Sequence, residues 1–176
     1  IIPWIEYVDR ITSIELPNGL TSIGDHAFES CESLTSIEIP ASVTEIGGFA
    51  FRNCEKLASV TFESGSQLNT IDAYAFSDCV SLISIEIPAG VDYIDRFAFS
   101  DCEKLASVTF EAGSQLKTIG EAAFLFCSAL TSIEIPASVT EIEENAFGGC
   151  CELESVTFEA GTQLKIIGER AFESCE

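Results

Sequence analysis

Hydrophobic residues recur along this chain with a period of 23 or 25 residues. The stretch 34–56 opens with apolar residues at alternate positions and closes with Ala50-Phe51-x-x-Cys54, and closely matching stretches follow it. A fixed period of this length indicates a solenoid, in which each coil buries its apolar face against its neighbours. We therefore expect one elongated repeat domain over residues 11–176, preceded by a capping segment over residues 1–10. The seven predicted coils are 11–33, 34–56, 57–81, 82–104, 105–129, 130–152 and 153–176.

Each coil is predicted to begin with a short strand. In the second coil Ile37 and Ile39 alternate with polar residues, which places the two isoleucines on the inward face of an extended segment. Pro40 ends that strand because proline has no N–H group for a strand ladder. The segment 43–46 predicts a second, shorter extended piece. In every second coil a longer, glycine-containing loop such as 63–68 replaces the proline bend.

The closing motif predicts two internal columns. The apolar spacing in Ala50-Phe51-x-x-Cys54 is typical of one tight helical turn, so we expect a 3₁₀ turn at the end of each coil. Coils stacked about 4.8 Å apart would place each phenylalanine over the previous one and each cysteine over the previous one. The two columns are Phe28, Phe51, Phe76, Phe99, Phe124, Phe147 and Phe172, and Cys31, Cys54, Cys79, Cys102, Cys127, Cys150 and Cys175.

The eight cysteines do not predict a disulfide framework. An inward column with an odd number of members cannot pair completely, and parallel side-chain directions are unsuited to bridging. We expect free thiols that act as small apolar core residues. Cys151 lies outside the column and is expected to point outward, as the most reactive thiol.

Chemistry needing metals, cofactors or nucleophiles is not predicted. The chain has one histidine, His26, and no C-x-x-C pair, so neither a zinc site nor a Ser–His or Cys–His nucleophile is expected. His26 is predicted to be a solvated loop residue. No glycine-rich phosphate loop is present. The expectation is a protein without enzymatic activity, metal or cofactor.

Charge limits the choice of partners. Acidic residues outnumber basic ones 29 to 8, for a net charge of −21. Such a surface repels nucleic-acid phosphates and anionic lipids, so we expect no nucleic-acid binding. No apolar run approaches the roughly 18 residues of a membrane span, so no membrane insertion is expected.

Two sets of outward residues are candidates for binding a partner. Glu38, Glu86 and Glu134 alternate with threonines along the outer face of the first strands, which spaces the like charges about 10 Å apart, near a Debye length. This stripe fits either a solvated ladder with little charge repulsion or a binding strip. The second set is aromatic and is expected to be exposed at variable positions. Its members are Phe49, Tyr74, Tyr93, Phe97 and Phe126.

The repeated wording L-x-S-I-x-I-P-x-x-V-x-x-I-x-x-x-A-F-x-x-C resembles the BspA-like, or Treponema-type, leucine-rich repeat over residues 11–176. Pro3-Trp4 ahead of residues 11–14 also resembles that family's cap-to-repeat junction. The resemblance implies a leucine-rich-repeat solenoid of the α/β class, rich in short parallel strands. It further implies a secreted or cell-surface protein that adheres to host matrix or microbial surface proteins. The family has no catalytic motif to carry over.

Two other functions remain open: an architectural spacer within a larger surface protein, and a carbohydrate-binding module. No polar cap follows Cys175, so the last coil is expected either to pack end to end with a second copy or to continue into further repeats. The lack of methionine favours a chain taken from a longer protein.

Overall fold

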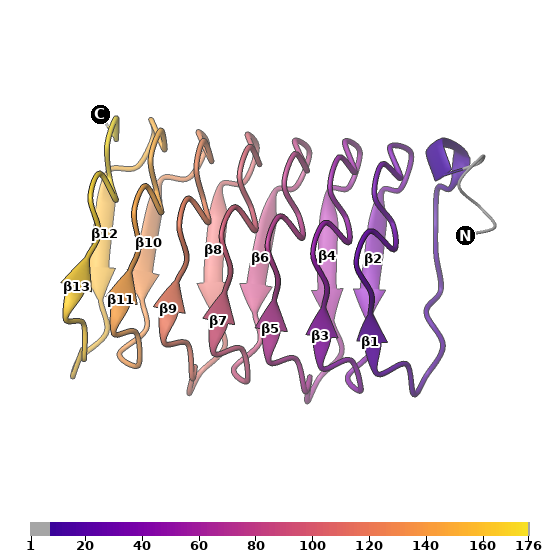
Figure 1. Ribbon diagram of the computed structural model, residues 1–176, viewed down its shortest axis with the longest axis horizontal. Coiled ribbons are helices and arrows are strands. Elements are labelled where there is room, and N and C mark those ends of the chain that lie inside the picture. Colours follow the sequence, from indigo (N-terminus) through magenta and orange to yellow (C-terminus); the bar gives the residue numbers. More distant parts are fainter. Residues whose placement is uncertain (1–7, 176) are drawn as a thin grey trace.

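The computed structural model describes residues 8–175, which form a solenoid of stacked coils with the two chain ends at opposite ends of the molecule (Figure 1). The capping segment expected over residues 1–10 lies mostly outside the described residues. Its described part is a single 3₁₀ turn, η1 (Val8–Arg10).

The predicted solenoid is confirmed by a seven-stranded parallel sheet that receives one short strand from each coil. Its register pairs equivalent residues of successive coils, such as Ile23 with Ile46 and Ile71 with Ile94. Its strands are β1 (Ser22–Ile23), β3 (Glu45–Ile46), β5 (Thr70–Ile71), β7 (Tyr93–Ile94), β9 (Thr118–Ile119), β11 (Glu141–Ile142) and β13 (Ile166–Ile167).

The longer strands form the opposite wall of the solenoid, behind the short strands in Figure 1. They come from the second to seventh coils. In the first coil the predicted long strand is absent, although Ile14 and Leu16 still pack against the core. The long strands are β2 (Ser36–Ile39), β4 (Ser59–Phe62), β6 (Ser84–Ile87), β8 (Ser107–Phe110), β10 (Ser132–Ile135) and β12 (Ser155–Phe158).

The long strands do not make one continuous sheet. The pairs β2–β4, β6–β8 and β10–β12 are each in register over four residues. Between β4 and β6 only Ser59 and Ser84 pair. The sheet ends at β8, which forms no ladder with β10. Each break follows a strand that ends in phenylalanine and leads into a longer loop. The wall is therefore a four-stranded sheet that is weakly paired between β4 and β6, followed by a separate two-stranded sheet.

Both predicted columns run through the core. Phenylalanine rings of successive coils stack with centroids 5.1–5.3 Å apart, and the five central rings are fully buried. All eight cysteines are free, and the six from Cys31 to Cys150 in the column are buried. Burying one such phenylalanine contributes about 1.5–3 kcal/mol, so the columns are a major source of stability.

The closing segments are not 3₁₀ turns, contrary to the expectation from sequence. The Ala50 N–H donates to the Gly47 carbonyl as in a tight turn, but the Phe49 N–H donates to the Ala73 carbonyl of the next coil. Phe49 and Asn53 have positive φ values of 59° and 58°. A 3₁₀ helix requires negative φ throughout. The N–H groups of Phe49, Phe51 and Asn53 all donate to carbonyls of the next coil, so the closing turns bond to one another along the rod.

Candidate interaction surfaces

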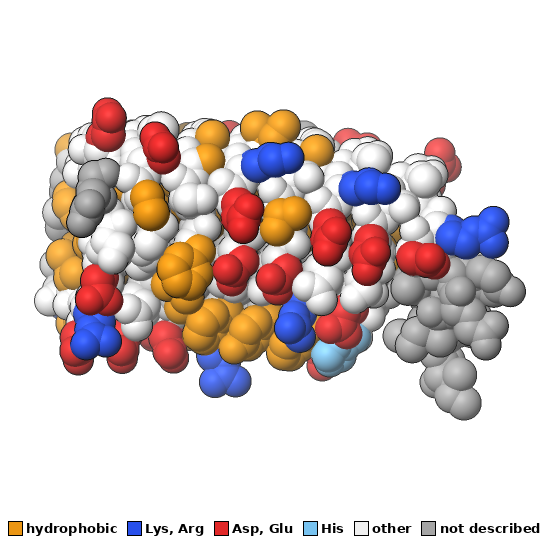
Figure 2. Space-filling view, turned by 90° about the horizontal axis from the view of Figure 1, so that it is seen from above, with side chains coloured by type: hydrophobic (Ala, Val, Ile, Leu, Met, Phe, Trp, Pro, Cys, Tyr) orange, Lys and Arg blue, Asp and Glu red, His pale blue; other side chains and the backbone are white. Residues whose placement is uncertain are grey.

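Four aromatic side chains form a stacked row on the surface, one from each of the first four coils. His26, Phe49, Tyr74 and Phe97 have successive ring centroids 4.8, 4.8 and 4.9 Å apart, with ring planes within 6° of parallel. We call this row the aromatic ladder. Seen from above, a hydrophobic band ends at the histidine (Figure 2). The ladder is distinct from the buried phenylalanine column, which begins two residues further along each coil.

The ladder stands on a backbone conformation that disfavours large side chains. All four of its residues have φ between 56° and 59°. A left-handed conformation is uncommon outside glycine and asparagine and costs of order 1 kcal/mol. Asn145, with φ 54°, occupies the equivalent position of the sixth coil. Stacking of the rings, at about 0.5–1.5 kcal/mol per pair, offsets the strain.

The aromatic candidates are less accessible than the sequence suggested. Phe49, Tyr74, Tyr93 and Phe97 are half-buried, and Phe126, at 51% exposure, is the accessible one. Within the ladder the rings cover one another's faces, so their edges are what solvent and partners meet. Phe126 lies against Gly149, where an added Cβ would collide with its ring. The Phe126 ring is therefore packed against the backbone of the next coil.

His26 is exposed, as predicted, but it is held in place. Its ring stacks on Phe49, and its Nδ1 lies 2.7 Å from a carboxylate oxygen of Glu29. Arg52 continues this cluster, 3.8 Å from Glu29 and 3.7 Å from Asp78. Its guanidinium lies 5.6 Å from the Phe49 ring centroid. The start of the ladder is thus fastened by a small network of charges.

Tyr93 lies apart from the ladder, on strand β7. It is half-buried, and burial followed by the negative charge of Asp95 and Glu143 raises its pKa to about 12. The phenol therefore stays neutral at physiological pH and can donate a hydrogen bond. It is the one aromatic side chain in the outward column of the short-strand sheet.

Glu38, Glu86 and Glu134 each line a separate shallow groove on the long-strand wall. The three grooves have volumes of about 430, 260 and 310 Å³, respectively. The second and third grooves coincide with the breaks between β4 and β6 and between β8 and β10. We call the three together the groove series. The sequence identified these glutamates but not the grooves.

The thiols of the cysteine column are hydrogen-bonded, and burial keeps them protonated. Each cysteine from Cys54 onward in the column donates its S–H to a phenylalanine carbonyl of the preceding coil, at 3.2–3.3 Å. Burial raises the pKa of Cys79, Cys102 and Cys127 above the ordinary range, and that of Cys150 to about 12. Within the described residues no group of three or more histidine, cysteine or acidic side chains is placed to hold a metal ion.

We expect one fast-reacting thiol in the folded protein. Cys151 is exposed, whereas the column thiols are buried and protonated at pH 8, and only the thiolate attacks disulfide reagents. Titration with a chromogenic aromatic disulfide should show one rapid equivalent, a slower one from half-buried Cys175, and eight after denaturation. The variant Cys151→Ser should lose the rapid equivalent alone. Rapid reaction of several thiols in the native protein would contradict the buried column.

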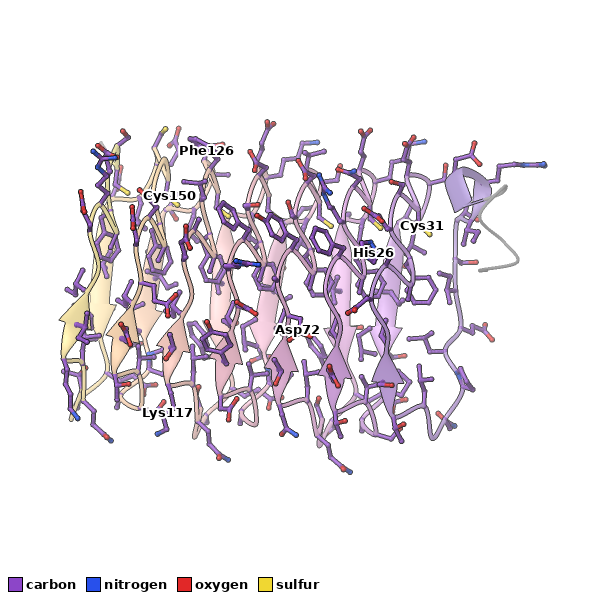
Figure 3. All side chains as sticks on the ribbon, in the orientation of Figure 1. His26, Cys31, Asp72, Lys117, Phe126 and Cys150 are labelled. Carbon is purple, nitrogen blue, oxygen red and sulfur yellow. The ribbon has the colours of Figure 1, made fainter. Side chains whose placement is uncertain are left out.

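Figure 3 shows Cys31 and Cys150 near opposite ends of the rod, with Asp72 between them on the short-strand side. Burial, together with the charges of Glu45, Asp95 and Asp25, raises the pKa of Asp72. Carboxylates are therefore crowded beside the aromatic ladder.

No helix among residues 8–175 is long and apolar enough to cross a bilayer.

Comparison with known proteins gives the family. The family model described as the BspA type leucine rich repeat region matches in six copies, over residues 6–114 and 106–176. No match was found among proteins with curated functions.

Solved structures agree with this assignment. The chain is 32% identical to a leucine-rich-repeat protein of T. pallidum, with a TM-score of 0.79, covering 94% of this chain and 74% of that one. It is 35% identical to a leucine-rich cell-surface protein of Faecalibacterium prausnitzii, with a TM-score of 0.74, covering 89% of this chain and 41% of that one. It is 32% identical to the pneumococcal vaccine antigen PcpA, with a TM-score of 0.72, covering 81% of this chain and 36% of that one. This chain is a member of the BspA-type leucine-rich-repeat family.

Proposed function

We propose that this chain is a non-enzymatic protein-interaction module of an exported surface protein and that it serves adhesion. The observation that carries the proposal is the aromatic ladder together with Phe126 on an otherwise acidic surface. Large aromatic side chains dominate binding energy at protein interfaces. Because their conformations are already fixed, they lose little freedom when a partner binds.

The similar proteins support a surface location. One is described as a cell-surface protein and another as a vaccine antigen. The chain spans 41% and 36% of those two, so the activity of any longer protein that contains it belongs to the proposal. The proposed partners are host matrix proteins or surface proteins of other microbes.

The test is a binding screen with a matched pair of variants. The purified chain is immobilised and exposed to a panel of matrix proteins and to whole microbial cells, and bound partners are quantified. The double variant Phe97→Asn with Phe126→Asn should weaken the strongest interaction by at least about tenfold, since hot-spot residues contribute 2 kcal/mol or more. The control Ile83→Asn removes an apolar side chain that is 55% exposed, close to the 51% of Phe126, and it should change the affinity little.

Three outcomes would overturn the proposal. Retention of full affinity by the double variant would show that neither Phe97 of the ladder nor Phe126 contacts the partner. Absence of any partner, with the variants stable and folded, would favour the architectural spacer. Binding on a glycan array without a protein partner would favour the carbohydrate-binding module.

We also propose that the last coil packs end to end with a second copy. Its residues Phe158 and Ile167 are 40% and 54% exposed, whereas the equivalent Phe62 and Phe110 are half-buried and the isoleucines equivalent to Ile167 in the inner coils are fully buried. Light scattering of this chain should show a dimer that Ile167→Lys converts to a monomer. A monomer at every concentration of the unsubstituted chain would overturn this part of the proposal.

A further inference from the structure

The three members of the groove series are built at equivalent positions of the coils, although the first has Ile14, Glu15 and Leu16 where the other two have valine, threonine and phenylalanine. Each pairs a long-strand glutamate with a glutamate from the loop that follows the next long strand. In the second groove these are Glu86 and Glu111, with Thr61, Val60 and Phe62 along one side. The third groove repeats the arrangement with Glu134 and Glu159, and the first has Glu38 and Glu63.

The loop glutamate of each groove is held by the backbone. Glu63 accepts a hydrogen bond at 2.9 Å from the Ala41 N–H. Glu111 accepts one from Ala89 at 3.0 Å, and Glu159 accepts one from Ala137 at 2.9 Å. One oxygen of each carboxylate is therefore fixed, and the negative charge at each groove does not depend on a mobile side chain.

The lining of a groove suits a long cationic side chain. Val60 and Phe62, or Val108 and Phe110, offer apolar surface for an aliphatic stem, while the two glutamates accept hydrogen bonds from an ammonium or guanidinium head. The half-exposed phenylalanine adds a favourable contact for a cation near its ring. A net charge of −21 attracts basic partners from a distance.

The spacing of the grooves selects the shape of the partner. Equivalent grooves recur every two coils, and two successive steps of the phenylalanine column, 5.1 and 5.2 Å, give a repeat of about 10 Å. A polyproline-II segment has three residues per turn and rises about 3.1 Å per residue, so every third side chain projects on the same side about 9.3 Å apart.

We propose that the groove series binds an extended basic segment of a partner protein that presents lysine or arginine at every third residue. The segment lies along the rod axis, across the long strands, and places one cationic side chain in each groove. This site is separate from the aromatic ladder and does not depend on it. A helix bearing cations seven residues apart has a similar repeat, and it serves as a competing occupant in the test.

The test uses three labelled peptides of equal charge and fluorescence anisotropy at fixed ionic strength. One carries three lysines in a Pro-Pro-Lys repeat, one has the same composition with its lysines contiguous, and one is a helical peptide with lysines seven apart. The repeat peptide should bind at least about tenfold more tightly than the other two, a difference of 1.4 kcal/mol. Equal binding of all three would reduce the effect to net charge and overturn the proposal. Tighter binding of the helical peptide would overturn the proposal that the bound segment is extended.

Charge-matched variants locate the site. The double variant Glu86→Gln with Glu134→Gln should bind the repeat peptide about tenfold or more less tightly than the unsubstituted chain. Glu55→Gln with Glu103→Gln removes the same charge from exposed positions outside the grooves and should change affinity less than about twofold. Equal effects of the two double variants would overturn the assignment. Peptide binding should survive Phe97→Asn with Phe126→Asn, so failure of the ladder and failure of the grooves are distinguishable.

Discussion

Replacing Phe99 with alanine is expected to lower the free energy of unfolding by about 3–5 kcal/mol. The Phe99 ring is fully buried, with the rings of Phe76 and Phe124 stacked 5.2 and 5.3 Å away. Removing it leaves a cavity that neighbouring coils cannot close, because the short-strand sheet fixes their spacing. Urea unfolding followed by circular dichroism measures the loss.

The control for Phe99→Ala is Phe97→Asn. Phe97 has one stacked neighbour, Tyr74 at 4.9 Å, and a φ of 56° that asparagine tolerates better than phenylalanine. We expect a change within about 1 kcal/mol, because lost stacking and relieved strain offset each other. Equal destabilisation by both variants would contradict the distinction between the core column and the surface ladder.

Replacing Cys102 with leucine is expected to lower the free energy of unfolding by roughly 1–3 kcal/mol, because a larger side chain must enter a closely packed column. The thiol is fully buried and donates to the Phe76 carbonyl at 3.3 Å. Leucine removes that hydrogen bond and needs room that the coils above and below do not offer. Thermal unfolding of the variant should show a lower midpoint.

Cys151→Leu is the matched substitution at an exposed thiol, and it should change the free energy of unfolding by less than about 0.5 kcal/mol. A neutral Cys102→Leu would show that the thiol column is loosely packed. A strongly destabilising Cys151→Leu would place that residue in the core, contrary to its exposure.

The sequence predicted the solenoid because equivalent residues recur at a fixed distance. Val43, Ile46 and Leu57 could be placed inside from their spacing alone, and each is fully buried. The free state of the cysteines followed from the odd number in the column. Pro40, Pro88 and Pro136 directly follow β2, β6 and β10, as their missing N–H groups require.

Conformations set by contacts between coils could not be predicted. The sequence around Phe49 and Asn53 has the apolar spacing of a helical turn, and only the hydrogen bonds to the next coil reveal the left-handed residues. Phe49, Tyr74 and Phe97 were predicted as exposed aromatic residues, but the row that they form with His26 was not predicted, because its stacking depends on that backbone. The second and third grooves lie at the breaks after β4 and β8. These strands share a terminal phenylalanine and a longer following loop, but that pattern alone does not show that the next strand separates there.

A crystal structure of this chain tests the central claim, that equivalent side chains of successive coils form continuous columns. The predicted result is phenylalanine rings stacked 5.1–5.3 Å apart from Phe28 to Phe172, with every column sulfur unbridged. Rings of successive coils that do not stack, or sulfurs joined in disulfide bonds, would contradict it.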